Sequence, residues 1–397
     1  MKFKCVYEDI NRAFLSIAKV NVRNSLFPIM ELIHIEASDD QITFRATNLE
    51  IIVETTINAK VEVKGKFVIN YANIGKIVNI VKNDILDIEL IDNMLHISSG
   101  KSKVKLQIGV YEDIPHLPII DQNKNTKINF KKDGFVNSIK QVNFAVANTE
   151  IKPEISSIYL YNKNEYIYTV ATDTFRLAEY RTLTNNLVKL EENNTNEVNN
   201  VNYDNLNQEL NLLIPGKNIN ILLPILDNLK DENLILESYE DGIMINGRDT
   251  VIALRTINGN FPDYVQLFPK EWLGIISVDK SALAGNLTAT TLFKDSYSYS
   301  NIKIKENILY ISTTNNNIGS YESEIEIQNY NLEKGEIVGF NKNNINANDQ
   351  VDLDEKSFML EASYNSSLLL DGLNKMNGNK TKLFFTTPNR PMFIKSE

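Results

Sequence analysis

The chain has 397 residues, 43% of them hydrophobic and 23% charged, and its formal net charge is −10. This composition predicts two or three soluble globular domains with hydrophobic cores, and the single cysteine, Cys5, excludes an internal disulfide framework. The N-terminus meets acidic residues before any apolar run develops, and no stretch approaches the ~20 apolar residues of a membrane span, so we expect a cytoplasmic protein.

The first third of the chain alternates between helices and groups of strands. Residues 8–19 are predicted to form an amphipathic helix, because Ile10, Phe14 and Ile17 recur at helical spacing. A second helix is predicted at residues 71–82. Strands are predicted at residues 29–37, 41–46, 50–57 and 66–70, and three more run to about residue 110.

The same succession recurs twice more. The remaining helices are predicted at residues 131–146, 216–229, 279–293 and 364–376, and further strands at 212–215 and 358–361. Six short helices and many strands predict an α+β fold of three repeated modules, each made of two half-units of the β-α-β-β-β kind. The linkers place the domains at residues 1–122, 123–273 and 274–397. Two Asn-rich stretches, at about 184–210 and 333–355, are predicted to be long surface insertions.

Each module also contains two β-rich arms around a turn of threonine and an Asx residue. Copies of this pattern lie at residues 43–55, 165–180 and 308–325. In the middle copy Thr172 and Asp173 stand at the turn, where an aspartate side chain bonds the backbone two residues on. We expect Phe175 and Leu177 to share one face of the second arm.

No local motif nominates a catalytic or metal site. His34, His96 and His116 each lack a metal-ligand partner at close spacing, and structural roles explain them more simply. The chain has no P-loop, no G-x-G-x-x-G after a strand and no G-x-S-x-G. The many carboxylates could still assemble an acid pair, so the residues alone leave open a β-rich repeat enzyme such as a carbohydrate hydrolase.

Every predicted helix carries basic residues. Cations near helix C-termini suit the helix macrodipole, and exposed lysines are common, which is the simpler interpretation. The alternative is that equivalent helices turn one basic face towards a single polyanion, whose phosphates are bound without sequence information. A net charge of −10 does not exclude nucleic acid, because the local distribution of charge decides binding.

Three segments match one known family in order along the chain, namely Ala46–Glu50, Ala171–Ala178 and Phe261–Tyr264. The start, Met1–Phe3, and the tail around Pro391 also fit. On these residues the chain resembles the bacterial DNA polymerase III beta subunit, the sliding clamp. The resemblance covers essentially the whole chain, with the two Asn-rich stretches as extra length.

The resemblance implies a non-catalytic homodimeric ring of six pseudo-equivalent units, with helices lining the hole and sheets outside. Such a ring encircles duplex DNA irrespective of sequence. It tethers the replicative DNA polymerase, the clamp loader and repair proteins through a short linear peptide motif. No cofactor, metal or membrane is implied. By position, the dimer interface would use Val104 and Leu106 of one subunit and Leu292 and Phe293 of the other.

The resemblance also implies a hydrophobic groove for partner peptides between the second and third domains. Matching positions for the groove are Ile155, Thr172, Thr174, Phe175, Arg176, Leu177, Pro262, Leu267, Pro391, Met392, Phe393 and Ile394. The family has Gly and His at Thr174 and Phe175, which predicts a tighter or shifted turn and a more apolar rim. Arg176 is expected to lay its stem on the apolar wall and reach a peptide carbonyl. The residues carried over as DNA-facing are Arg12, Lys19, Arg23, Lys76, Lys82, Lys132, Lys140, Thr149, Lys152, Lys217, Lys280 and Lys375.

A clamp-like ring specialised for repair, or for a phage or plasmid replisome, would carry the same residues, and genome context would separate it from a replicative clamp. The hydrolase alternative predicts instead a cleft with a perturbed acid pair and no ring.

Overall fold

The computed structural model describes residues 1–21, 26–80, 85–108, 115–120, 127–149, 151–164, 166–183, 210–269, 272, 274–293, 299–305, 307–328, 352–354, 357–385 and 390–397. These residues form two compact units, Met1–Phe261 (unit 1) and Pro262–Glu397 (unit 2). Among them, no helix combines the length and the apolar character that a membrane crossing requires.

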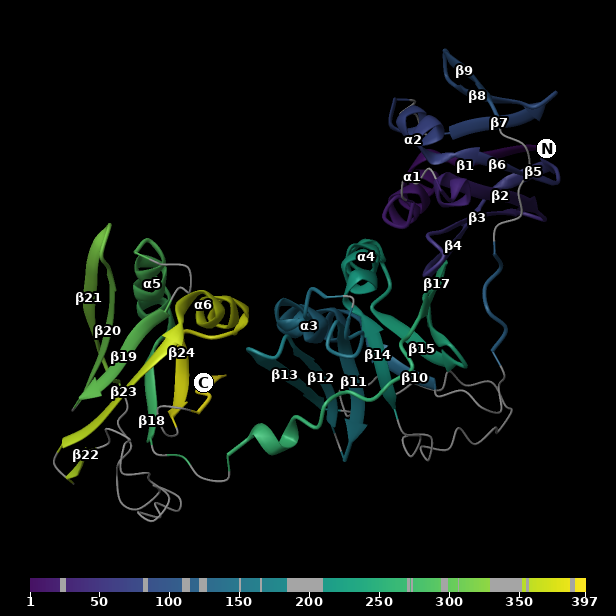
Figure 1. Cartoon of the computed structure of the whole chain (residues 1–397). Helices are drawn as coiled ribbons and strands as arrows, with labels where there is room; N and C mark the ends of the chain where they lie inside the picture. The colour runs from purple at the N-terminus through teal and green to yellow at the C-terminus, as the bar shows by residue number, and fades with distance from the viewer. Residues whose placement is uncertain are drawn as a thin grey trace. The chain divides into compact units, whose positions relative to one another are not determined.

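Unit 1 starts with a first set of elements, called module 1 here (Figure 1). Module 1 contains β1 (Lys2–Val6), α1 (Tyr7–Ile17), η1 (Pro28–Glu31), β2 (Leu32–Ser38), β3 (Gln41–Thr47), β4 (Ile51–Asn58), β5 (Lys60–Val63), β6 (Gly65–Asn70), α2 (Tyr71–Ile80), β7 (Ile85–Ile91), β8 (Met94–Ser99) and β9 (Ser102–Gln107). Helix α1 buries Ile10, Phe14 and Ile17, as its periodicity predicts, and Glu8 and Asp9 in its first turn suit the positive end of the helix dipole.

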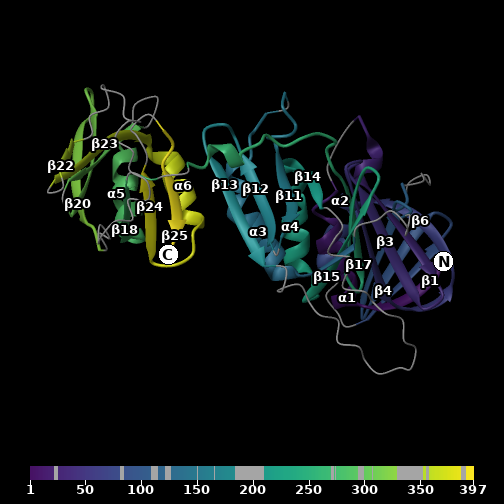
Figure 2. The same ribbon diagram turned by 90° about the horizontal axis from the view of Figure 1, so that it is seen from below.

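The second set of elements in unit 1, module 2, follows the same order. It contains β10 (Lys127–Lys131), α3 (Lys132–Val142), η2 (Asn143–Ala145), β11 (Ser157–Lys163), β12 (Tyr166–Thr172), β13 (Leu177–Leu183), β14 (Asn211–Pro215), α4 (Gly216–Asn228), β15 (Asn233–Tyr239), β16 (Gly242–Asn246) and β17 (Thr250–Arg255). Helix α3 packs on β12 and β13, and α4 packs on β14, so both helices cover one face of the sheet β13-β12-β11-β14 (Figure 2).

Unit 2 holds the third set, module 3. It contains η5 (Val265–Leu267), β18 (Gly274–Asp279), α5 (Lys280–Thr291), β19 (Tyr299–Lys305), β20 (Ile308–Asn315), β21 (Gly319–Glu326), β22 (Asp352–Asp354), β23 (Ser357–Asn365), α6 (Ser366–Lys375), β24 (Lys380–Phe385) and β25 (Phe393–Ser396). Asp279 caps α5 by accepting from the Ala282 amide, and Asn365 caps α6 through the Leu368 amide. The predicted α+β fold with a repeated order of elements is thereby confirmed.

Antiparallel pairing assembles the strands into five sheets. Unit 1 contains the sheets β5-β1-β7-β8-β9, β13-β12-β11-β14 and β10-β15-β16-β17-β4-β3-β2-β6, and unit 2 contains β18-β24-β25 and β21-β20-β19-β23-β22. The eight-stranded sheet runs from module 2 into module 1 because β17 pairs with β4. Buried apolar residues form three clusters, two in unit 1 and one in unit 2.

Several predicted boundaries were wrong. The strand predicted at 29–37 begins only at Leu32, because Pro28 lacks the ladder N–H and starts a 3-10 turn instead. The helix predicted at 131–146 ends at Val142 and tightens into the 3-10 turn η2. The predicted half-unit begins with a strand, but no residues were assigned to the short strands β1, β10 and β18, which precede α1, α3 and α5.

The Asn-rich stretches fall mostly outside the described residues. Of the stretch predicted as an insertion at about 333–355, Asp352–Asp354 instead forms strand β22 on β23, which corrects that part of the prediction. Most of the stretch at 184–210 is not described. Its last residue, Leu210, is buried in the module 2 cluster and is therefore not part of a surface insertion.

Candidate functional site

The turn between β12 and β13 is built by its own side chains. Thr172 Oγ1 donates to the Arg176 carbonyl at 2.8 Å and accepts from the Thr174 amide at 3.2 Å. Asp173 Oδ1 accepts from the amides of Phe175 and Arg176 at 3.0 and 2.9 Å. Thr174 takes a φ of +76°, in the left-handed region, so the backbone keeps a conformation that suits glycine although the residue is β-branched. A β-branched residue is strained in this conformation.

Module 1 contains the same turn between β3 and β4. Thr47 Oγ1 donates to the Ile51 carbonyl and accepts from the Leu49 amide, both at 2.9 Å, and Asn48 takes the place of Asp173. Leu49 has a φ of +72°, matching Thr174. The third copy, between β20 and β21, differs, because its left-handed residue is Gly319 with a φ of +129°. The predicted repeat of the turn is confirmed in full for the first two copies only.

The turn holds Arg176 and exposes Phe175. The Arg176 guanidinium pairs with Asp173 through Nε and Oδ2 at 3.0 Å and lies 5.2 Å from the centroid of the Phe144 ring. Strand β13 begins at Leu177, so Phe175 lies in the turn with 84% of its surface exposed and does not share a strand face with Leu177, contrary to the prediction. Leu177 is half-buried and Ile155 is buried.

The other predicted groove residues lie in unit 2. Pro262 is exposed and 59% of Leu267 is exposed. In the tail, Pro391 is exposed, whereas the half-buried Met392 and Ile394 pack against the hydrophobic cluster of unit 2. The tail thus belongs to a hairpin with β24.

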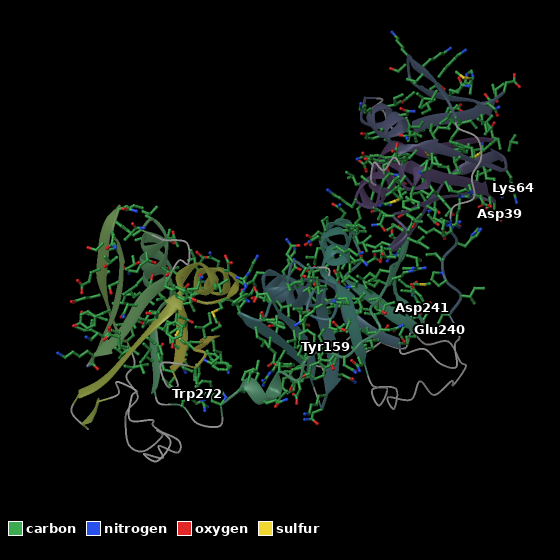
Figure 3. All side chains as sticks on the ribbon, in the orientation of Figure 1. Asp39, Lys64, Tyr159, Glu240, Asp241 and Trp272 are labelled. Carbon is green, nitrogen blue, oxygen red and sulfur yellow. The ribbon has the colours of Figure 1, made fainter. Side chains whose placement is uncertain are left out.

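Phe393 turns to the opposite face of that hairpin. Its ring lies 5.1 Å from the ring of Phe268 and 4.9 Å from that of Trp272, and Trp272 also contacts Phe384 at 5.1 Å between centroids. Figure 3 labels Trp272. This aromatic cluster fastens the segment before β18 to the sheet β18-β24-β25.

Two of the predicted DNA-facing lysines bind helix ends. Lys132 opens α3 and its Nζ donates to the carbonyl of Leu229, the residue that caps the C-terminus of α4, at 2.6 Å. Lys280 opens α5 and donates in the same way to the carbonyl of Met376, which caps α6, also at 2.6 Å. A lysine is unfavourable at the N-terminus of its own helix, and contact with the negative end of the neighbouring helix offsets that cost.

Other basic residues in the predicted set form ion pairs or stand exposed. Arg12 pairs with Asp9 at 2.9 Å, Lys140 with Asp227 at 2.9 Å, and Lys217 with Glu50 at 3.3 Å. The exposed residues are Lys19, Lys76, Lys152 and Lys375. Thr149 is half-buried, and its hydroxyl accepts from the Ile151 amide at 3.2 Å. Arg23 and Lys82 lie outside the described residues.

The junction between β17 and β4 buries apolar side chains. Its register pairs Val251 with Glu54 and Ile252 with Val53. Val53 and Ile252 belong to one cluster with Val20, which follows α1, and all three are fully buried. Residues of module 1 therefore complete the core of module 2.

In each module, residues that pair across neighbouring strands form a row that runs across the sheet. Each row begins in the strand before the first helix of its module, the same number of residues ahead of that helix. The row contains Phe3, Ile88, Ile97 and Val104 in module 1; Ile128, Leu236, Ile245 and Ile252 in module 2; and Ile276, Leu383 and Ile394 in module 3. In this register β9 is the counterpart of β17, and Lys103 is the counterpart of Val251.

A second register relates β4 to β21. Leu32 pairs with Asn70 directly before α2, and Tyr299 pairs with Asn365 directly before α6. Counting across the paired strands from these positions makes Glu54 the counterpart of Glu322 and Val53 the counterpart of Tyr321.

Strands β9 and β21 each lie at the edge of a described sheet and carry opposite charges. Strand β9 exposes Lys103 and Lys105, and β21 exposes Glu322, Glu324 and Glu326. Edge strands present unpaired backbone groups that can pair with another chain. Sequence reasoning missed these charges, although their alternation was visible in the sequence.

Apolar residues accompany these charged edges. Val104 and Leu106 of β9 are half-buried against the module 1 cluster. Beside β21, 72% of Leu292 is exposed, and the Phe293 ring stacks on Tyr321 with 6.2 Å between centroids. Phe293 lies as far beyond the start of α5 as Val20 lies beyond the start of α1.

His116 and Cys5 are held by the fold. His116 contacts Arg45 between Nδ1 and Nη1 at 2.9 Å, and Arg45 also pairs with Glu54 at 2.7 Å. Burial raises the pKa of the Cys5 thiol to about 12, and the Asp9 carboxylate adds to the effect. In the described part of the chain, no group of three or more His, Cys, Asp and Glu side chains could hold a metal ion.

A cavity of about 430 Å³ opens beside α3 in module 2. Phe130, Phe135, Leu160 and Tyr180 are among its lining residues. None of the predicted groove, DNA-facing or interface residues lines it.

Two family descriptions match the chain. Residues 1–118 match the N-terminal domain of the DNA polymerase III beta subunit, and residues 129–263 match its central domain. Together these matches cover more than half of the chain.

Known sliding clamps are similar over almost their whole length. The beta sliding clamp of Bacillus subtilis is 24% identical over 406 aligned positions, covering 100% of this chain and 96% of the relative, and that of Staphylococcus aureus strain Mu50 is 23% identical over 383 positions. The solved sliding clamp from Bacillus subtilis matches with a TM-score of 0.82 at 21% identity, and the beta subunit from Thermotoga maritima with 0.80 at 18%. Each structural match covers 100% of this chain and 95% of the other.

Proposed function

We infer the working surfaces of this chain from the premise that it belongs to the DNA polymerase III beta subunit family. The chain is a DNA sliding clamp, a non-catalytic processivity factor of the polymerase. Neither a hydrolase nor a specialised clamp-like ring is favoured by the relatives. We propose three domains, at residues 1–122, 123–273 and 274–397, and a cytoplasmic location, which the single buried Cys5 supports.

The proposed assembly is a head-to-tail homodimeric ring that encircles duplex DNA. The observation that supports this ring is the pairing of β17 with β4. The counterparts of these two strands elsewhere in the chain are β9 and β21, and each of them lies at the edge of a described sheet. When β9 of one subunit pairs with β21 of the other in the register of β17 and β4, both of these edges are covered. The same contact at both ends of two identical subunits closes a ring.

That register assigns partners across the proposed subunit junction. Lys103 falls opposite Glu322, as Val251 falls opposite Glu54, and Val104 falls opposite Tyr321, as Ile252 falls opposite Val53. Phe293 takes the place of the buried Val20, and the exposed Leu292 precedes it. Three of the four predicted interface residues, Val104, Leu106 and Phe293, therefore lie where this register would bury them, whereas Leu292 corresponds to the exposed Lys19. A cross-strand pair of opposite charges adds about 0.2–1 kcal/mol.

A charge exchange tests this junction. Lys103→Glu places two carboxylates opposite each other and shifts the dimer towards monomer in analytical ultracentrifugation. Combining it with Glu322→Lys restores the opposite charges and the dimer. Lys127→Glu, on the module 2 strand β10, is the control for a change of net charge. A double variant no more dimeric than Lys103→Glu alone would contradict the register.

For the DNA-facing surface, the exposed Lys19, Lys76, Lys152 and Lys375 are the strongest members of the predicted set. Lys132 and Lys280 are better explained by their bonds to helix ends. Arg12, Lys140 and Lys217 each form an ion pair with a carboxylate, which must break before the side chain can bind a phosphate. Breaking an ion pair at the surface costs little free energy. Arg23, Lys82 and Thr149 remain proposals from the resemblance.

Topological binding to DNA tests the function as a whole. Clamp loaded on a nicked circular plasmid should co-migrate with it in high salt and should be lost when one restriction cut makes the plasmid linear. Equal retention on circular and linear DNA would mean ordinary binding and would overturn the ring. Glutamate at Lys19 and Lys76 should reduce loading without changing the dimer, because the phosphate contacts depend on charge.

The residues proposed for binding partner peptides include the exposed Phe175, Pro262 and Leu267 and the half-buried Arg176 and Leu177. Thr172 and Thr174 build the turn that carries Phe175 and Arg176, and the buried Ile155 is proposed as part of the same set. Among solved relatives, the clamp from Caulobacter crescentus has polyethylene glycol at its putative tethering region, and that of Pseudomonas aeruginosa has been solved bound to griselimycin. The replicative polymerase, the clamp loader and repair proteins are the proposed partners. The tail residues Pro391, Met392, Phe393 and Ile394 complete the proposed groove set, and Phe393 and Ile394 are held there by pairing with Phe384 and Leu383 of β24.

A further inference from the structure

The chain contains three Asn-Gly pairs, Asn246–Gly247, Asn258–Gly259 and Asn377–Gly378. In such a pair the main-chain nitrogen of the glycine can attack the side-chain amide of the asparagine, because glycine has no Cβ to obstruct the approach. The attack needs a rotation of the main chain between the two residues, which moves the asparagine carbonyl and the glycine N–H. Hydrogen bonds on these groups therefore decide which pair reacts.

Hydrogen bonds hold two of the pairs in place. The side-chain amide of Asn246, at the end of β16, donates to Glu237 at 2.7 Å, and the N–H of the glycine that follows donates to the carbonyl of Thr250 at 2.9 Å. The carbonyl of Asn377 accepts from the hydroxyl of Ser396. An attack at either pair must first break these bonds.

The pair Asn258–Gly259 is held differently. Both residues are exposed, and among the described residues none forms a hydrogen bond with either of them. The segment is instead anchored on both sides of the pair. The N–H of Ile257 donates to the carbonyl of Leu213 in β14 at 2.8 Å, and the ring of Phe261 stacks on that of Tyr159 with 5.0 Å between centroids.

We propose that Asn258 is a site of spontaneous deamidation, and that its isoaspartate product releases the hydrogen bond of Ile257 to β14. The nitrogen of Gly259 bonds to Cγ of Asn258, and the side-chain nitrogen leaves as ammonia together with the proton of the attacking N–H. Water then adds to a carbonyl carbon of the succinimide and breaks one of its two C–N bonds. One cleavage gives aspartate and the other gives isoaspartate. This modification needs neither DNA nor a partner, so it goes beyond the proposed function.

Isoaspartate lengthens the main chain, which then runs through the side-chain methylene. Only residues 258–260 lie between the two anchors, so the added atom must displace one of them. The hydrogen bond of Ile257 is the less tolerant anchor, because a hydrogen bond weakens steeply with its angle, whereas aromatic rings pair in several arrangements. Both products also carry a new carboxylate next to Gly259, against which the side chain of Glu154 lies. Repulsion between these like charges adds to the displacement.

Ageing of the full-length protein in mildly alkaline buffer tests the site. Mass spectrometry of digested samples follows the conversion of each Asn-Gly pair, and chromatography separates aspartate from isoaspartate. In the folded protein, Asn258 should convert at least about tenfold faster than Asn246, because attack at Asn246 must first break two hydrogen bonds. Asn377, with one such bond, should lie between them. In denaturant the three pairs should convert at similar rates, because the bonds that distinguish them are gone. Equal rates at Asn258 and Asn246 in the folded protein would overturn the assignment of the site.

Hydrogen exchange tests the released segment. In the isolated isoaspartate form, the amide of Ile257 should exchange about fivefold faster than in fresh protein, because it has lost its acceptor. Asn258→Gln, whose longer side chain does not form a succinimide, should exchange like fresh protein after the same ageing. Asn260→Gln, an exposed change in the same segment, is the matched control and should convert and loosen as the unchanged chain does. Isoaspartate at position 258 with unchanged exchange at Ile257 would overturn the release, and so would equally fast exchange in aged Asn258→Gln.

Discussion

Replacing Lys132 by methionine removes a charge that binds a helix end and keeps most of the side-chain volume. In the native chain, Nζ of Lys132 donates to the carbonyl of Leu229 at 2.6 Å, at the C-terminus of α4. A hydrogen bond to a charged group contributes about 1.5–3 kcal/mol, and Lys132 is half-buried, so we place the loss near the lower end, about 1.5 kcal/mol. For a unit of this size, that loss lowers the melting temperature by roughly 3–6 °C.

The assay combines calorimetry with hydrogen exchange. The amides in the last turn of α4 should exchange faster in Lys132→Met, because the carbonyl end of the helix has lost its cation. Lys280→Met provides an internal repeat, since Lys280 binds the Met376 carbonyl in the same way in unit 2. Lys140→Met is the matched control. Its ion pair with Asp227 is exposed on both sides, so its loss should change stability by less than about 1 kcal/mol.

DNA loading decides between the two roles of Lys132. If the lysine caps a helix, Lys132→Met should retain the clamp on a nicked circle as well as the unchanged chain does, once dimer concentrations are matched. Unchanged stability together with faster loss from the circle would refute the reasoning and return Lys132 to the DNA-facing set.

Three further outcomes are expected. Thr174→Gly should stabilise unit 1 by about 0.5–1 kcal/mol in urea titration, because glycine tolerates the φ of +76°, whereas Thr182→Gly, in extended backbone, should destabilise it, and the opposite order would contradict the strain. Leu177→Asp should abolish binding of a partner peptide while Leu183→Asp, 41% exposed on the same strand, should not, and equal binding would remove Leu177 from the groove. Cys5 should resist iodoacetamide at pH 8.5 until urea unfolds the chain. Because its pKa is raised to about 12, folding stability should fall as the pH rises above about 9, where the unfolded thiol ionises first.

The sequence predicted the helices well because their cores repeat at helical spacing, as Ile10, Phe14 and Ile17 show. It missed β1, β10 and β18, since each is a short strand whose existence depends on pairing with β7, β15 and β24 far along the chain. Local pattern carries no information on such partners until the register is known.

In the candidate site, too, local contacts were predictable from the sequence and long-range contacts were not. The Thr172 turn was predictable because its hydrogen bonds are local, linking residues at most four apart. The role of Lys132 was not, because its partner Leu229 lies 97 residues away. Phe175 was placed on a strand face by alternation alone, and the turn's left-handed Thr174 removed it from that face.

The two kinds of strand junction in this chain suit different lifetimes. Between β17 and β4, fully buried side chains such as Val20, Val53 and Ile252 make a contact that is part of a core. At the proposed junction of β9 and β21, Lys103 and Glu322 replace Val251 and Glu54 as facing residues, and exchange with solvent ions costs such a pair little. A ring that must open around DNA needs a junction weaker than the joints within each subunit. The same strand register can therefore provide a permanent joint where it is apolar and a reversible one where its exposed positions carry opposite charges.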